Sequence, residues 1–198
     1  MYNFKYIIIM RTKQHLITEV NNLIIKLGLS HQDLIDSWDL SDSQIDISQV
    51  KVGMIWYEDD TFSSEKIAGK KIKAIVELVH RGVIYGDLTA SDILDVKEQQ
   101  LTWYNAQNYV NGIPYRLRSK EWITWQDEYR IGLVYSKYES VKNAFKLIDK
   151  PCRQGVQWSS TKLNANQGWS KDFDNGNGYI HGTYMHASVR PIIARRVK

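Results

Sequence analysis

The pattern of apolar and polar positions predicts two helices in the first 50 residues. Apolar side chains recur at helical spacing over residues 12–27, and a glycine follows as a stop signal. Ser30, followed three positions later by Asp33, predicts the cap of a second, short helix. Residues 39–49 are polar and rich in serine, so we place a domain boundary there. Residues 1–50 are expected to pack on the following domain or to serve as an attachment or oligomerisation segment; a DNA recognition helix is a third alternative.

Alternating patterns predict strands in the next part of the chain. Residues 52–57 are rich in β-forming residues, and the acidic residues 58–60 predict a hairpin turn after them. Residues 71–80 alternate as a strand, and Arg81-Gly82 turns into a partner strand at residues 83–85. One face of the longer strand is predicted to carry Ile72, Ala74, Val76 and Leu78.

Three helices are expected after these strands. Residues 101–110 change to a helical period, and Asn111-Gly112 ends that helix with residues that tolerate a left-handed backbone. Its apolar face consists of Trp103, Ala106 and Val110. Ser119 is the expected cap of a second helix over residues 120–135, whose apolar stripes are Trp122, Trp125, Tyr129 and Leu133. A third, short helix ends before Pro151 and carries Val141, Ala144, Phe145 and Ile148.

Short strands joined by tight turns are predicted for the carboxy-terminal part. They cover residues 169–173, 179–184 and 189–194, and Asn175-Gly176 is a hairpin turn. Residues 51–198 are therefore expected to form one α+β domain. The predicted architecture is an irregular mixed, mostly antiparallel sheet with two to four helices, preceded by the N-terminal helical segment.

Composition favours recognition over catalysis or nucleic-acid binding. Seven Trp and twelve Tyr stand against four Phe, so much of the aromatic surface carries a polar group that suits partly wet interfaces. The net charge is +4, but the two signs are interleaved and no long basic field is present. We therefore expect no nucleic-acid partner.

The cysteine content and the short apolar run argue against disulfide-bonded, thiolate-metal, exported and membrane-spanning proteins. Cys152 is the only cysteine, so one chain forms neither a disulfide nor a thiolate metal cluster. The apolar run at residues 6–10 is too short for a signal peptide or a membrane span. We expect no membrane insertion and no signal peptide. Met10 is an alternative start to Met1, because residues 1–9 have little pattern of their own.

Several separate blocks, in order, resemble a known family over about residues 52–194. Residues 102–106 read TWYNA, residues 115–122 read YRLRSKEW, residues 158–161 read WSST and residues 189–192 read VRPI. Trp169, Phe173 and Gly176 stand between the last two blocks. This order resembles the C-type-lectin-like domain that ends bacterial adhesins, Bacteroides surface proteins and phage fibres. The first block resembles the family's first helix and the second its R-L-P-[ST] entry into the second helix, with Arg118 in place of the proline.

The resemblance implies a scaffold more than a chemistry. Calcium-dependent sugar-binding members carry E-P-N or Q-P-D and W-N-D, which are absent here, and one Cys152 cannot supply the paired-cysteine copper site of the related formylglycine-generating enzymes. Trp158 and Trp169 are expected in the core, with Ser159, Ser160 and Thr161 satisfying backbone groups in an irregular loop. Arg190, extended before Pro191, is expected to reach inward to a carboxylate or carbonyl.

No catalytic or metal-binding pattern emerges from the spacing of polar residues. The oxygen-rich Asp172, Asp174, Asn175 and Asn177 fail the calcium-loop pattern and are explained as a hairpin turn. Asp59 and Asp60 are expected to be solvated turn residues, and His181 and His186 are wrongly spaced for a shared zinc. No enzyme activity, metal or other cofactor is expected. If the domain binds a ligand, the expected ligand-binding residues are Asn164, Asn166, Gln167, Asn175, Asn177, Tyr179, His181 and Tyr184.

These observations predict a non-catalytic recognition or structural display protein. The first hypothesis is a phage fibre, head decoration or receptor-binding component, located in the virion and binding a cell-surface glycan or protein receptor. Its N-terminal helices would contact virion proteins or form a homo-oligomer. The alternatives are a bacterial surface adhesin, a variable protein of a diversity-generating retroelement with the same fold, and an enzyme with an unrecognised site.

Overall fold

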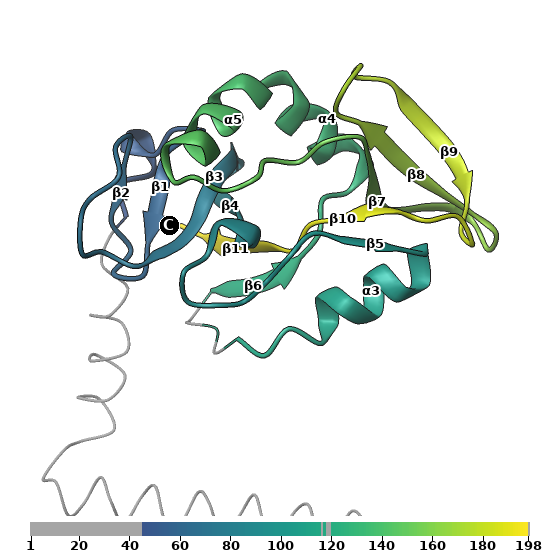
Figure 1. Ribbon diagram of the computed structural model, residues 1–198, viewed down its shortest axis with the longest axis horizontal. Helices are drawn as coiled ribbons and strands as arrows, with labels where there is room; N and C mark the ends of the chain where they lie inside the picture. The colour runs from purple at the N-terminus through teal and green to yellow at the C-terminus, as the bar shows by residue number, and fades with distance from the viewer. Residues whose placement is uncertain (1–44, 116, 118–119, 198) are drawn as a thin grey trace, which may run out of the picture. The chain divides into compact units, whose positions relative to one another are not determined.

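The computed structural model describes residues 45–197 except 116, 118 and 119. The two helices expected before residue 39 and the cap expected at Ser119 lie outside the described residues. The two N-terminal helices therefore stay a prediction. The helix that Ser119 was expected to cap does not begin there, because Glu121–Thr124 form a strand and the next helix starts at Glu128. The described chain is α+β, with three α-helices and two mostly antiparallel sheets instead of the single sheet expected (Figure 1).

The first sheet has six strands in the order β2-β1-β3-β4-β11-β6, and every neighbouring pair is antiparallel. Its strands are β1 (Ile55–Tyr57), β2 (Phe62–Ser63), β3 (Ile72–His80), β4 (Val83–Asp87), β6 (Glu121–Thr124) and β11 (Ile192–Arg196). The β1–β2 hairpin and the Arg81-Gly82 turn between β3 and β4 confirm the predicted turns.

The second sheet has five strands in the order β5-β10-β7-β8-β9. Its strands are β5 (Gln99–Leu101), β7 (Val156–Asn164), β8 (Gln167–Asp172), β9 (Gly178–Gly182) and β10 (Ala187–Val189). Only the β10–β7 pair is parallel. β9 forms the outermost edge of this sheet, at the right of Figure 1, with β8 beside it.

Three α-helices pack against these sheets, and two 3₁₀ turns, η1 (Ile47–Gln49) and η2 (Leu88–Ala90), precede them in the chain. The helices are α3 (Trp103–Asn111), α4 (Glu128–Ser136) and α5 (Tyr138–Leu147). Thr102 caps α3 by accepting from the Asn105 N–H, and Asp127 caps α4 by accepting from the Arg130 N–H. The predicted buried face of α3 is confirmed, and α5 buries three of its four predicted positions as helical residues.

Strand β3 is buried on both faces, which corrects the prediction of one apolar face. Ile72 and Ile75 pack with α5, Leu78 packs with residues of α4, and Ala74 and Val76 belong to a separate cluster on the other side. The strand pattern is broken by a register shift between Val76 and Leu78. A bulge of this kind moves the following side chains to the opposite face.

The predicted helix over residues 120–135 is wrong in its first part. Residues Glu121–Thr124 form β6, because they pair with the carboxy-terminal strand β11 in the register Ile193↔Ile123. The helix starts only after the Asp127 cap. Gly112 also differs from expectation: it ends α3 with φ −88° and ψ 0°, outside the left-handed region.

Two further strand predictions need correction. Ser159, Ser160 and Thr161 were expected in an irregular loop but belong to β7, which pairs with β8 on one side and with β10 on the other. The strand expected over residues 189–194 is divided between β10 and β11 at Pro191, which lacks the N–H that a continuing ladder needs.

Gly86 in the middle of β4 lies where a side chain has no room. A Cβ atom there would stand 2.6 Å from the Cβ of Ala74 and 3.1 Å from Cε3 of Trp56. Gly86→Ala is expected to lower the free energy of unfolding by about 1–3 kcal/mol through overpacking, measured by urea denaturation. Gly132→Ala on α4 is the control, because its Cβ meets no atom within 4 Å, and it is expected to stabilise the protein.

Candidate recognition surface

The turn between β7 and β8 carries three of the predicted ligand-binding residues. Asn164 donates from its Nδ2 to Gln167 Oε1 at 2.7 Å and accepts the Asn166 N–H at 2.9 Å. All three residues are exposed. This turn therefore presents amide groups whose positions are already held by short-range hydrogen bonds.

The turn between β8 and β9 carries Asn175 and Asn177 and is also held by its own side chains. Asp172 accepts the Asp174 N–H at 2.9 Å and the Asn175 Nδ2 at 2.7 Å, and Asn175 accepts the Asn177 N–H at 2.8 Å. Gly176 adopts φ 80°, with Tyr135 packed where a Cβ would lie. In the described part of the chain, no group of three or more His, Cys, Asp or Glu residues is placed to hold a metal ion.

These two turns lie at opposite ends of β8 and do not form one surface. β8 is six residues long, which corresponds to about 20 Å at the usual rise of a strand. Tyr184 belongs to the end with Asn166, because the neighbouring Thr183 N–H donates to Asn166 O at 2.9 Å. Asn175 and Asn177 approach Tyr179 at the other end. The structure thus divides the predicted site into two groups.

Tyr179 and His181 lie on the face of β9 that turns toward the aromatic core, called here the inner face. Their rings stack with centroids 5.6 Å apart, and His181 meets the buried Trp158 edge-to-face at 6.1 Å. The Oγ of Ser170 lies 3.3 Å from Nδ1 of His181. Both candidate rings are half-buried and have packing partners, so they support the sheet in addition to any contact with a ligand.

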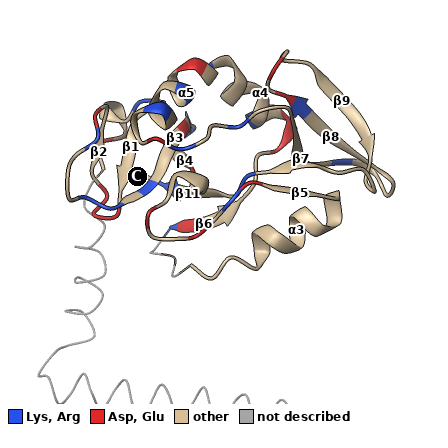
Figure 2. Ribbon diagram, in the orientation of Figure 1, with Lys and Arg blue, Asp and Glu red and all other residues tan. Residues whose placement is uncertain are grey.

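The opposite face of β8 and β9, the outer face, consists of Trp169, Ile180 and Tyr184. Trp169 and Ile180 are cross-strand neighbours, and a Cβ on Gly182 would meet the ring of Tyr184 at 2.4 Å, so this ring lies over Gly182. Ile180 is 42% exposed and Tyr184 is 75% exposed. β9 and α3 carry no charged residue, as Figure 2 shows. Lys171, two positions after Trp169 in β8, lies toward the β8–β9 turn and donates from its Nζ to Gly176 O. The outer face is therefore uncharged around Trp169, Ile180 and Tyr184, away from that turn.

Sequence reasoning missed Ile180 as a member of this surface and wrongly expected Trp169 in the core, where Trp158 alone of the two is buried. The alternation Tyr-Ile-His within β9 already places Ile180 opposite the two aromatic rings. Which of the two faces is open depends on α3 and on Trp158, which cover the inner one. Only the packing of distant elements supplies that information.

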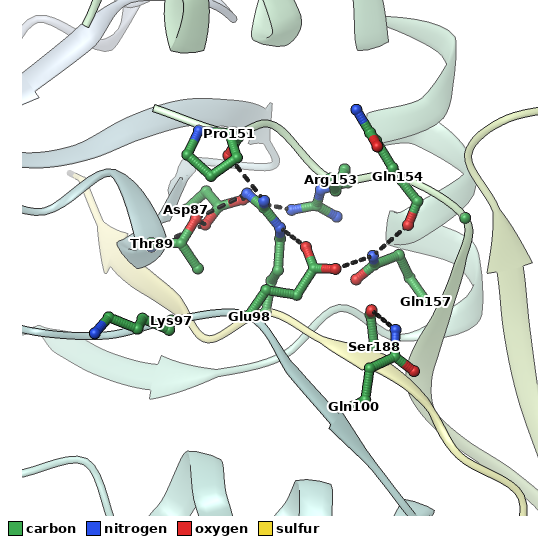
Figure 3. A network of polar contacts seen from close by, with 12 residues as sticks. Asp87, Thr89, Lys97, Glu98, Gln100, Pro151, Arg153, Gln154, Gln157 and Ser188 are labelled. Atoms are coloured by element: carbon green, nitrogen blue, oxygen red, sulfur yellow. Dashed lines mark hydrogen bonds and ion pairs between the residues drawn. The ribbon is translucent and has the colours of Figure 1, made fainter. Parts of the chain in front are cut away.

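A buried ionic cluster, not predicted from the sequence, joins the two sheets, and Figure 3 shows the part of it around Asp87, Glu98 and Arg153. We call it the Arg153 cluster, and its charged members are Glu77, Asp87, Glu98, Arg153 and Arg190. Arg153 binds Glu77 and lies 3.0 Å from Asp87; Arg190 binds Asp87 at 3.0 Å, Glu98 at 2.5 Å and the Pro151 carbonyl at 2.9 Å. The expectation that Arg190 reaches inward is confirmed.

The cluster displaces the pKa values of its two fully buried carboxylates in opposite directions. Burial raises the pKa of Glu77 to about 7, although the charge of Arg153 partly offsets this. Burial acts on Asp87 in the same sense, but Arg190 and Arg153 outweigh it and lower the pKa of Asp87 to about 2. Three carboxylates share two guanidinium groups, and the excess of negative charge adds to burial in favouring a proton on Glu77.

A second buried ionic group corrects the expectation for the first hairpin turn. Asp60 was expected to be solvated but is only 6% exposed, and it accepts from Trp56 Nε1 at 3.0 Å, from Lys73 Nζ at 2.5 Å and from Arg195. Lys73 also lies 3.0 Å from Glu121 on β6. Asp59 was also expected to be solvated, and its salt bridge with Lys70 is indeed half-exposed.

Comparisons with known proteins identify no family for this chain. A scan against protein-family models and a search of the curated proteins found no match to this chain. Among the described residues, no helix is long and apolar enough to cross a membrane.

Proposed function

We propose that this chain is a non-catalytic recognition protein whose outer face binds a neutral, hydrogen-bonding ligand, either a glycan or a polypeptide. The observation that carries the proposal is Tyr184, three-quarters exposed beside the preorganised amides of the Asn164–Gln167 turn. An exposed tyrosine supplies a large contact area at a small entropic cost, and nearby amides supply directional hydrogen bonds.

The position of the ionisable groups supports a non-catalytic role. Glu77 and Asp87, whose pKa values are displaced in opposite directions, are fully buried and bound to arginines. A substrate has no contact with a carboxylate in that position. Ion pairs of this kind perturb pKa values without chemistry. The alternative of an enzyme would need a site elsewhere.

The order of the sequence blocks is the basis for proposing where this protein acts. The blocks TWYNA, WSST and VRPI fall on α3, on β7 and across the β10–β11 junction, in an α+β arrangement compatible with a C-type-lectin-like domain. We extend the proposal accordingly to a fibre or receptor-binding component of a phage virion, with residues 1–50 as the attachment segment. A bacterial surface adhesin would use the same outer face.

The test is binding of the purified full chain to bacterial cells and to a glycan array. Tyr184→Ala is expected to weaken binding at least about tenfold, the effect of removing one central aromatic contact. Tyr179→Ala tests the inner face separately, and Leu147→Ala, at an exposed site on α5, is the control. Binding is expected to persist in a chelator. Equal binding by the Tyr184→Ala variant and the control would contradict the proposal.

A further inference from the structure

Strand β9 leaves one row of backbone groups without a partner in the described chain. It is the last strand of its sheet, and within residues 45–197, apart from the three not described, no strand pairs with its outward edge. Figure 1 shows β9 at the outer margin of the described residues. Natural sheets protect such an edge with a charge, a proline or a bulge. β9 reads Gly-Tyr-Ile-His-Gly, has none of these, and pairs with β8 over five residues without a register shift.

The hydrogen-bond pattern identifies Ile180 as the open residue. The Asp172 N–H donates to Asn177 O, and the Thr183 N–H donates to Asn166 O, both at 2.9 Å. Hydrogen-bonded pairs alternate along an antiparallel ladder. Tyr179 and His181 therefore turn their backbone groups toward β8, and Ile180 turns its N–H and C=O outward, as do its neighbours Gly178 and Gly182.

We propose that β9 pairs with β9 of a second copy of this chain, antiparallel, about a two-fold axis through Ile180. The strand is self-complementary in this register. Ile180 meets the Ile180 of the other copy as a hydrogen-bonded pair, Tyr179 lies opposite His181, and Gly178 lies opposite Gly182, so that no bulky side chains collide at the flanks. Cross-strand aromatic pairs stabilise such a ladder.

The charges next to β9 fit the same partner. The β8–β9 turn carries Asp172 and Asp174 together with Lys171, which donates to Gly176 O, and no acidic residue follows Asp174 in the chain. Antiparallel pairing directs the two carboxylates of this turn in one copy toward the segment after β9 in the other, which contains His186 and no carboxylate. Like charges are thus kept apart, as a self-association surface requires.

Pairing through β9 would join the outer faces of the two copies. Cross-strand neighbours lie on the same side of a sheet, so Ile180 of each copy stands next to the other, with Trp169 and Tyr184 flanking them. The exposed apolar surface of Ile180 becomes buried, and a doubled outer face results. Pairing of two copies through β9 does not depend on whether the outer face binds a ligand.

The test is sedimentation equilibrium of the full chain, with two variants at Ile180. Ile180→Pro removes an N–H that points away from β8, which an edge strand tolerates, and is expected to weaken self-association about 30-fold through the two hydrogen bonds at the axis. Ile180→Lys places two like charges at the axis and should act in the same direction. Leu147→Lys, at an exposed apolar site on α5, should leave the mass unchanged.

Amide hydrogen exchange separates this contact from any association through other segments. The Ile180 amide is expected to become protected as the wild-type chain is concentrated, and to stay unprotected in Ile180→Lys. A wild-type chain that stays monomeric would overturn the proposal, and so would an oligomer whose mass both variants leave unchanged or one without protection at Ile180. If Ile180→Pro fails to fold, Ile180→Lys and the exchange data decide the question.

Discussion

Replacing Arg153 by methionine is expected to lower the free energy of unfolding by about 3–5 kcal/mol, the cost of leaving buried carboxylates without their cation. Arg153 is 2% exposed and binds both Glu77 on β3 and Asp87 on β4. Methionine fills much of the same volume, so the loss of stability mainly measures the effect of removing the charge. Arg190 remains close to Asp87 and limits the effect there, whereas within the described residues Glu77 keeps neutral Gln126 as its hydrogen-bond partner.

The matched control is Arg130→Met. Arg130 forms an ion pair with Asp127 in which both side chains are partly exposed, and such pairs contribute no more than about 1 kcal/mol. Both variants are compared with the wild type by urea denaturation at pH 7. A loss at Arg153 no larger than the loss at Arg130 would show that the cluster is not a stabilising connection between the sheets.

Glu77 is expected to make the protein less stable as the pH rises from about 5 to 8. Its pKa is raised from 4.5 to about 7 in the folded state by burial. The folded protein therefore binds this proton more tightly than the unfolded chain. The resulting stabilisation is complete below the unfolded pKa and is lost as the pH rises through the folded pKa, a change on the order of 3 kcal/mol.

The groups that face Glu77 act on it from several elements. They are Arg153 before β7, Asp87 on β4, Gln126 before α4 and Arg190 after β10. Asp87 affects stability in the opposite direction, because its pKa is lowered to about 2 in the folded state. The stabilisation from Asp87 is therefore lost as the pH falls below about 4. Maximum stability is expected in mildly acidic solution.

The measurement is urea denaturation from pH 4 to 8 of the wild type and of Glu77→Gln. The variant keeps the shape of the side chain and removes the titration, so its stability should change less between pH 5 and 8. The five histidines are common to both proteins, and the difference between the two curves isolates Glu77. Parallel curves would mean that Glu77 does not change its protonation in this range.

Local signals were sufficient for α3, α5 and the turns. Thr102 caps α3, and Trp103 and Val110 are buried on the predicted face. Arg81-Gly82 and Asn175-Gly176 lie in turns where a positive φ occurs, at Arg81, Gly82 and Gly176. Each of these features depends on residues within a few positions of one another, so the sequence alone contains the necessary information.

Pairing with a distant strand determined the secondary structure of the region after α3. Trp122 and Trp125 follow a helical spacing that predicts a helix, yet Trp122 lies in β6 opposite Ala194 of β11. A strand partner at the far end of the chain outweighs a weak local preference. The candidate site divided for the same reason, since the strand β8 separates the two asparagine-rich turns that the linear sequence brings close together.

The sequence by itself determined the α+β class, the absence of an intrachain disulfide, three of the tight turns and the aromatic, uncharged character of residues 178–184. The tertiary structure alone decided that Ile180 and Tyr184 face outward while Tyr179 and His181 face Trp158, and that Glu77, Asp87 and Arg153 meet in the interior. The physical reason is the same in both cases. Burial and partners are set by which distant strands pair and in which register, and a shift of one residue exchanges the two faces of a strand.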